Sequence, residues 1–270
     1  MRVSLAFALI GLTAFLSASA PAPARQRGGF RRQPIDRDWH YDGAFVFCRI
    51  AFRQASYGDG GGWSVDYPRA DLNLPFRLGQ LTTTPISRDE RGEPHHVVIT
   101  LDDPRLFECP FIMMTEPGGL YLDSTEAARL REYLDKGGFL WADDFWGDYA
   151  WDVWEHEIRK VLPAGGFPIY DLKPDHPLFQ TQYPVKGVPQ IPSIRVWRPG
   201  GSTSEYGEDS IEVHGRGIND KAGRLMVFMT HNTDIDDAWE REGEDPRYFL
   251  EFGPNGYALG INVILYALSH

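Results

Sequence analysis

The sequence predicts an α/β fold in which helices cover both faces of a mostly parallel sheet. Short apolar runs without strict alternation, at residues 44–52, 111–116 and 224–230, are typical of strands that are buried on both sides. Segments with the apolar spacing of helices lie between them, at residues 123–136 and 151–162. A chain that alternates strand and helix in this way builds a parallel sheet with helices on both faces.

The elements of the first half follow from local signals. The run AFVFCRIAF (44–52) is rich in β-branched and aromatic residues and leads into a glycine-rich stretch, YGDGGGW (57–63). Leucine and phenylalanine then recur at helical spacing between residues 72 and 81. Two further strands are predicted at HVVITL (96–101) and FIMMTE (111–116).

The clearest helix signal in the second half lies at residues 123–136. Asp123 or Ser124 can cap its first turn, and Gly137 follows its last residue. The remaining segments, each predicted from its composition, are a buried strand (138–143), a helix (151–162), proline-rich loops (163–198), a strand (224–230) and an apolar closing helix (257–268).

We expect an exported protein, periplasmic or secreted, because residues 1–24 have the layout of a secretory signal peptide. A short positive start precedes an apolar run that is too short to anchor the chain permanently in a bilayer. Small residues then lead to a cleavage site after Ala24. Residues 25–43 are expected to form a flexible lead-in, and residues 44–270 a single domain with a loop-rich insertion at about 163–215.

Composition excludes two classes of protein. With 42% hydrophobic and 24% charged residues the chain is typical of a globular protein, and no second apolar stretch is long enough to span a membrane. The formal net charge is −11, and it falls to about −16 without the arginines of the first 32 residues. A domain this acidic repels phosphate backbones, so we expect no nucleic-acid partner.

Three predicted strands end in polar residues, at 115–119, 143–147 and 230–234. Binding sites of open parallel sheets form beyond the carboxyl ends of the strands. The sequence therefore predicts a site where these three segments meet.

Two of these segments resemble the class I glutamine amidotransferase-like superfamily, which has a flavodoxin-like α/β fold and includes trehalose-utilisation-type (ThuA-like) relatives. The stretch TEPGGLYLDSTEAARLREYLDKGGFLWADD (115–144) resembles the part from the oxyanion-loop strand to the nucleophile-elbow strand. The stretch GRLMVFMTHNTDIDDAWE (223–240) resembles the late strand that ends in a histidine.

From about Phe45 to His270 the chain more closely resembles an exported bacterial family known only as a domain of unknown function. Its recurrent motifs stand here as GGWSVDYPRADLN, EPGGL, GGFLWADDFWG, PDHPLF, PQIPSI, MTHNTDI and WEREGEDP. Relatives of that family often accompany MoxR-type ATPases and von Willebrand A-domain membrane proteins. The resemblance thereby implies a membrane system of this kind as partner.

The chain departs from the amidotransferases where their nucleophile lies. Their elbow reads Gly-x-Cys-x-Gly, whereas residues 142–146 here read ADDFW and hold no thiol. Cys48 and Cys109 lie in or beside predicted strands, so we expect two buried free thiols. The alternative, a disulfide, requires their Cα atoms to lie within roughly 7 Å. Glutamine hydrolysis is therefore not expected.

The candidate catalytic residues are His231, Asp143 and Asp144. If the strand continues through both aspartates they face opposite ways, so one can enter the cleft while the other caps the next helix. His231 is a candidate general base beside an aspartate, a metal ligand, or a structural residue at the end of a buried strand.

Further candidates line the same predicted cleft. Gly118 and Gly119 fall where amidotransferases place oxyanion-hole amides, although a simple turn explains them equally well. Trp146 beside carboxylates suggests a carbohydrate ligand, because an indole ring stacks on sugars. The full set of candidate ligand-binding residues is Glu116, Gly118, Gly119, Trp146, Asn232 and Asp234.

Two other acidic stretches allow more than one interpretation. Asp66, Tyr67 and Asp71 either anchor the glycine-rich loop to the sheet or rim the cleft. The stretch DIDD (234–237) suggests calcium only weakly, since it lacks the glycine and distal glutamate of an EF-hand.

The sequence thus favours an exported, non-catalytic ligand- or partner-binding domain, without a resident metal or cofactor. The alternative is a hydrolase that uses His231 with Asp143 or Asp144, with or without a metal.

Overall fold

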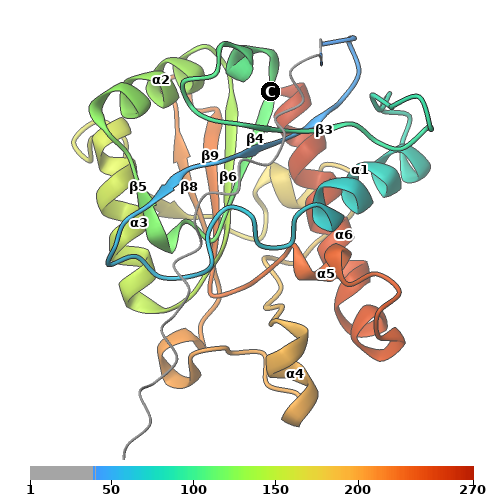
Figure 1. Ribbon diagram of the computed structural model, residues 1–270. Helices are drawn as coiled ribbons and strands as arrows, with labels where there is room; N and C mark the ends of the chain where they lie inside the picture. The colour runs from blue at the N-terminus through green and yellow to red at the C-terminus, as the bar shows by residue number, and fades with distance from the viewer. Residues whose placement is uncertain (1–38, 40) are drawn as a thin grey trace, which may run out of the picture. The chain divides into compact units, whose positions relative to one another are not determined.

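A seven-stranded sheet forms the centre of the computed structural model, which describes residue 39 and residues 41–270 (Figure 1). The predicted signal peptide and most of the predicted lead-in lie outside the described residues. In spatial order the strands are β3 (His96–Ile99), β1 (Phe47–Ile50), β4 (Phe111–Thr115), β6 (Phe139–Phe145), β9 (Leu225–His231), β8 (His214–Asn219) and β7 (Tyr170–Asp171).

The first five strands are parallel, while β8 pairs antiparallel with β9, and β7 with β8. Counted along the chain, the parallel strands stand in the order 2-1-3-4-5, which is that of flavodoxin-like sheets. The prediction of a mostly parallel α/β fold is confirmed.

Helices cover both faces of this sheet, as predicted (Figure 1). The α-helices are α1 (Arg69–Leu81), α2 (Ser124–Asp135), α3 (Gly147–Val161), α4 (Ile194–Gly200), α5 (Asp237–Glu240) and α6 (Pro246–Ser269). Short 3-10 turns are η1 (Pro104–Glu108), η2 (Pro117–Gly119), η3 (Pro177–Gln180) and η4 (Gly207–Ser210), and β2 (Arg53–Gln54) pairs with β5 (Leu120–Tyr121) beside the main sheet.

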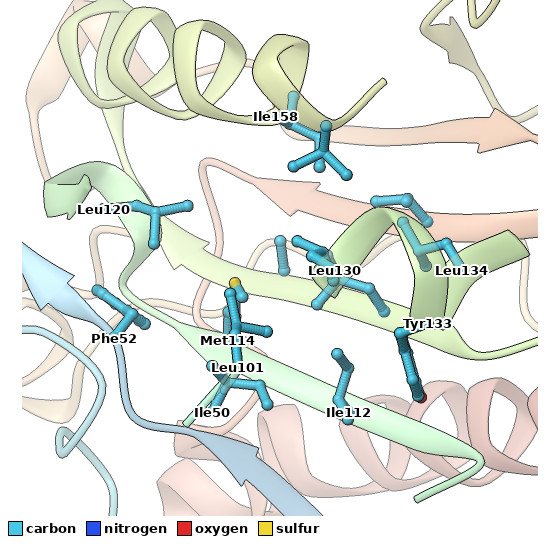
Figure 2. Close-up of a cluster of buried hydrophobic side chains, with 14 of the residues drawn as sticks. Ile50, Phe52, Leu101, Ile112, Met114, Leu120, Leu130, Tyr133, Leu134 and Ile158 are labelled. Atoms are coloured by element: carbon cyan, nitrogen blue, oxygen red, sulfur yellow. The ribbon is translucent and has the colours of Figure 1, made fainter. Parts of the chain in front are cut away.

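Successive residues of β4 enter two different hydrophobic cores. Ile112 and Met114 of β4 pack with α2 and α3, and Figure 2 shows this core with Leu130 and Ile158. Phe111 and Met113 point to the other face, where α1, α5 and α6 lie. Because both faces are covered, every side chain of β4, β6 and β9 is buried, which explains why these strands do not alternate between apolar and polar residues.

Helix α2 begins as the sequence predicts. The side chain of Asp123 accepts hydrogen bonds from the N–H groups of Thr125 and Glu126, and the side chain of Glu126 accepts one from the N–H of Asp123. Together these bonds form a capping box. The chain leaves this helix through Gly137, whose φ of 102° suits glycine.

Helix α6 begins at Pro246, well before the predicted residue 257. The side chain of Asp245 caps it and Pro254 lies inside it. Among the described residues, no helix combines the length and apolar character needed to cross a membrane.

The proline-rich segment and the stretch that follows it contain more regular structure than predicted. Helix α4 holds Trp197 against Tyr248 with ring centroids 5.4 Å apart, so packing rather than propensity stabilises it. Strand β8 is unexpected because Gly215 and Gly217 weaken any strand signal. A Cβ atom at these positions would lie 2.6 Å from Val188 and 2.5 Å from Leu225.

The expectation of two free thiols is wrong. Cys48 on β1 and Cys109 just before β4 form a disulfide, with Cα atoms 6.2 Å apart. Because β1 and β4 are neighbours in the sheet, the two side chains lie within bonding distance.

Candidate functional site

Four residues other than glycine adopt a left-handed backbone in the described part of the chain. Glu116 (φ 51°) follows β4, Asp144 (φ 60°) lies near the end of β6, and Asn232 (φ 62°) follows β9. Asp66 (φ 63°) precedes α1. Such conformations cost about 1–3 kcal/mol each and concentrate at functional sites. All of these positions are acidic or amide side chains, and three of them lie at or just beyond the carboxyl ends of neighbouring strands.

Asp144 is the next-to-last residue of β6, just before the turn into α3. Its carboxylate is 5% exposed, and its Oδ1 accepts the indole N–H of Trp146 at 2.9 Å. Burial raises the pKa of Asp144 well above its ordinary value, and the carboxylates of Glu116 and Asp66 raise it further.

Asp143 faces away from Asp144 and holds the loop that follows β9. One carboxylate oxygen accepts from the hydroxyl of Thr230, and the other accepts from the N–H groups of Ile235 and Asp236 at 2.9 and 3.2 Å. The carboxylate is fully buried and all its bonds are internal, so Asp143 has a structural role.

Neither aspartate caps α3, contrary to the sequence interpretation. The N–H of Gly147 donates to Asn232 Oδ1 at 2.8 Å, and the N–H of Asp148 donates to Asp209 Oδ2 at 3.3 Å. The cap therefore comes from two loops that are remote in sequence. Asn232, a predicted ligand contact, is occupied by this role and by a bond from its Nδ2 to the carbonyl of Glu212.

A small cavity of about 50 Å³ opens beside Asp144. This volume admits an ion or one or two water molecules, but no sugar ring. Four acidic residues line it. The cavity is lined by Asp59, Gly60, Glu116, Gly118, Asp144, Phe145, Trp146, Ala150, Glu205 and Tyr206.

The glycine-rich loop before α1 wraps around the carboxylate of Glu116. The N–H of Gly62 donates to Glu116 Oε2 at 2.6 Å, and a Cβ atom at Gly60 would approach the same oxygen to 2.8 Å. Side chains are excluded here because the backbone itself holds the carboxylate. Burial raises the pKa of Glu116 to about 7, against the lowering effect of the backbone N–H groups of Gly62 and Gly61.

Gly118 and Gly119 are required by close packing. A Cβ atom at Gly118 would lie 2.7 Å from that of Ala150 on α3, and one at Gly119 would lie 2.8 Å from the carbonyl of Asp59. Gly118 lines the cavity, whereas the carbonyl of Gly119 receives the N–H of Ala55.

His231 lies apart from both aspartates. Its Nε2 donates to the carbonyl of Gly147 at 3.0 Å, and its Nδ1 accepts from Arg216 at 3.3 Å, so the ring is neutral and both nitrogens are occupied. Burial lowers the pKa of His231 to about 4. The structure thus does not bring the three predicted catalytic residues together, and it leaves His231 without a free nitrogen.

Trp146 lines the cavity but is almost fully buried. Its side chain is only 5% exposed, and its N–H is bound to Asp144. The ring therefore gives no support to sugar stacking.

A group of three buried aspartates lies behind the cavity. The carboxylate oxygens of Asp66, Asp144 and Asp234 come within 4.8 Å of one another. Asp234 was a predicted ligand residue, and Asp66 was one of three residues with two possible roles. Neither oxygen of Asp66 has a hydrogen-bond partner.

A buried ion pair beside this group escaped the sequence reasoning. Arg49, fully buried on β1, bonds to both Asp71 and Asp236. Burial opposes its charge, but these two carboxylates outweigh burial and raise its pKa. The sequence sign of this buried ion pair is the single arginine inside the apolar run AFVFCRIAF.

With this geometry in view, a family model of known proteins matches most of the chain. The domain of unknown function DUF4159 covers residues 51–268. The chain belongs to this family. The match includes the three grouped aspartates and Glu116, so the site lies within the DUF4159 domain. The expectation of a domain family of unknown function is confirmed. The curated proteins contain no significant match to the chain.

Proposed function

We propose that this chain is an exported, non-catalytic binding domain of the class I glutamine amidotransferase-like architecture, whose acidic cavity takes a cationic group. The observation that carries the proposal is Asp144, which has a left-handed backbone just before the strand-to-helix turn and lines a cavity with three other acidic residues. That turn corresponds to the nucleophile elbow of the amidotransferases. A carboxylate there, in place of a thiol, supports binding rather than acyl transfer.

The histidine geometry supports the same conclusion. A general base needs a free nitrogen within hydrogen-bond reach of its substrate. Both nitrogens of His231 are bound to the protein, and its pKa of about 4 leaves it uncharged at neutral pH. The hydrolase alternative, with His231 acting beside Asp143 or Asp144, therefore has no support from the contacts of these residues.

The charge and size of the cavity favour a cation over a sugar. Its carboxylates belong to Asp59, Glu116, Asp144 and Glu205, and Arg, Lys and His are absent from its lining. A cluster of this sign attracts a positive group and repels an anion. The volume of about 50 Å³ suits an ion or the tip of a basic side chain.

Export has its own support. The disulfide between Cys48 and Cys109 is typical of proteins that leave the reducing cytosol. Together with the predicted signal peptide it supports a periplasmic or secreted location. The association with a MoxR-type ATPase and von Willebrand A-domain membrane system stays a prediction.

The proposal can be tested by calorimetry on the purified mature chain. Spermidine and an arginine-containing peptide should bind at low salt, whereas glucose and an acidic peptide of equal length should not. Glu205→Gln should weaken the binding of both cationic probes, and Glu251→Gln, an exposed change on α6, is the matched control. Equal binding of neutral or acidic probes would contradict the proposal.

A second assay addresses catalysis. The chain should release no ammonia from glutamine and hydrolyse no activated ester above the buffer rate. Turnover that disappears in His231→Asn, with folding intact, would overturn the non-catalytic role.

A further inference from the structure

We propose that Asp66, Asp144 and Asp234 bind a hard divalent cation of the Ca²⁺ or Mg²⁺ class. This inference rests on the proposed binding of cations in the acidic cavity, and it names the ion that would lie deepest in the site. The carboxylate oxygens of the three residues lie within 4.8 Å of one another, as ligands of a single ion must. Their side chains belong to three separate segments, and each residue is at most 6% exposed.

The carboxylate of Asp66 is the observation that indicates a bound ligand. Both of its oxygens are buried, and neither has a hydrogen-bond partner. Buried carboxylates are normally paired or hydrogen-bonded, because the loss of hydration is otherwise uncompensated. A cation held between Asp66, Asp144 and Asp234 compensates that loss directly.

The arginines near the group are already engaged. Arg49 pairs with Asp71 and Asp236. Arg241 pairs with Asp237 at 3.0 Å and with Glu240 at 2.6 Å. Within residues 41–270, none of the ion pairs includes a member of the three-aspartate group.

The other contacts of the group orient its ligands. Asp144 Oδ1 accepts from the indole of Trp146, and Asp234 Oδ1 accepts from the N–H of Asp237 at 2.9 Å. Of the six carboxylate oxygens, these two accept hydrogen bonds from the described residues. Partners of this kind fix the direction of a metal-binding carboxylate.

The ligand set selects the class of ion. All three ligands are carboxylates, and His231 is turned to Gly147 and Arg216. Oxygen ligands without nitrogen or sulfur favour Ca²⁺, Mg²⁺ and Mn²⁺ over zinc or copper. Three carboxylates leave coordination positions for water, and Asp144 connects the group to the cavity through which the ion enters.

A second group, Asp66 with Asp237 and Glu240, also has closely spaced carboxylate oxygens. Two of its members pair with Arg241, whereas none of the three aspartates of the first group has an ion-pair partner among the described residues. It provides a matched control, since Glu240→Gln changes a partly buried carboxylate beside Asp66 without touching Asp144 or Asp234.

The first experiment measures thermal stability. The mature chain is treated with EDTA, dialysed at pH 7.5 and melted with Ca²⁺, Mg²⁺ or Mn²⁺, or with NaCl at matched ionic strength. An ion at about 100 times its Kd should raise the melting temperature by about 5–10 °C. The ion with the lowest Kd identifies the resident metal, and no shift beyond the NaCl control with any of the three overturns the proposal.

Variants locate the site. Asp66→Asn and Asp234→Asn should each raise the Kd of the ion at least tenfold, because each removes one of its carboxylate ligands. Glu240→Gln should keep the native Kd within about twofold. An unchanged Kd in both aspartate variants overturns the proposal.

A spectroscopic arm does not depend on variants of the ligands. Tb³⁺ replaces Ca²⁺ in oxygen sites and emits when a nearby tryptophan transfers energy to it. Trp146 is bonded directly to Asp144, so the native chain should show sensitised emission that Ca²⁺ displaces, and Trp146→Phe should lose most of it. Emission unchanged by Trp146→Phe overturns the site.

The two proposals fail separately. If spermidine binds but no divalent ion does, the proposal of a cation-binding acidic cavity is supported and the proposal of a metal site is refuted. If neither binds, both fall.

Discussion

Replacement of Arg49 by methionine should destabilise the protein more than any change at the cavity. The guanidinium is fully buried. Its Nε and Nη2 bond to Asp71 Oδ1 at 2.8 and 2.5 Å, and its Nη1 bonds to Thr115 Oγ1 at 2.6 Å. The same Nη1 reaches the carbonyls of Trp63 and Val65, each at 3.2 Å.

The magnitude follows from what methionine leaves behind. Asp71 would lose its buried counter-ion, and removal of one partner of such a pair costs about 3–5 kcal/mol. Two carbonyl groups would also lose a donor, at about 1 kcal/mol or more each. These losses share one side chain and do not add fully, so we expect about 5 kcal/mol. For a chain of this size the melting temperature should fall by about 10–20 °C.

The assay is a thermal and urea unfolding series followed by circular dichroism. Arg49→Lys keeps the charge but loses the planar fork, and should lie between the native chain and Arg49→Met. Adding Asp71→Asn to Arg49→Met should restore part of the loss, because the stranded carboxylate is gone. If Arg49→Met melts within about 3 °C of the native chain, or the two losses simply add, the reasoning is refuted.

Three further outcomes are expected, the two pH series being measured in EDTA. His231 has a folded pKa of about 4, so as pH falls from about 6.5 the unfolded chain takes up a proton that the folded chain does not, and up to about 3 kcal/mol of stability is lost by pH 4. In urea titrations, the free energy of unfolding of His231→Gln should therefore change less steeply with pH than that of the native chain. An equal slope in the two proteins contradicts the buried neutral ring. Glu116 has a raised pKa of about 7, so the stability of the folded chain falls as pH rises from about 4.5 to 7. Glu116→Gln should therefore be more stable than the native chain by about 1–2 kcal/mol at pH 8 after solvent screening. A variant that is no more stable at pH 8 counts against the raised pKa. Loss of the Cys48–Cys109 bridge, which spans 61 positions, should cost about 3–4 kcal/mol, and an unchanged melting temperature in Cys48→Ala/Cys109→Ala would disprove this.

Where the signal was local, the sequence predicted the fold well. The capping box of Asp123 and Glu126 lies within four residues, and the uninterrupted apolar runs of β4 and β9 identify strands buried on both faces. The prediction also located the turn at Asp144, because polar residues follow an apolar strand there. It missed β8, whose Gly215 and Gly217 carry no strand preference and pair only because β9 lies beside them.

The sequence predicted that the candidate residues lie at strand ends, but it did not predict their contacts. Asp143 and Asp144 are adjacent in sequence, yet one holds a loop through Thr230 and the other faces the cavity. His231 lies at the end of β9, as predicted, but both nitrogens of its ring are bound by Gly147 and Arg216, which gives it a structural role.

By itself the sequence determined the α/β class, the polar residues at the strand ends and the absence of a cysteine from residues 142–146, since each depends on residues close together in the chain. Only the tertiary structure decided which carboxylates lack a partner. Arg49 lies 187 positions from Asp236 and pairs with it, while neither oxygen of Asp66 has a hydrogen-bond partner. Burial and ion pairing are properties of side chains brought together from distant segments, and local patterns do not contain them.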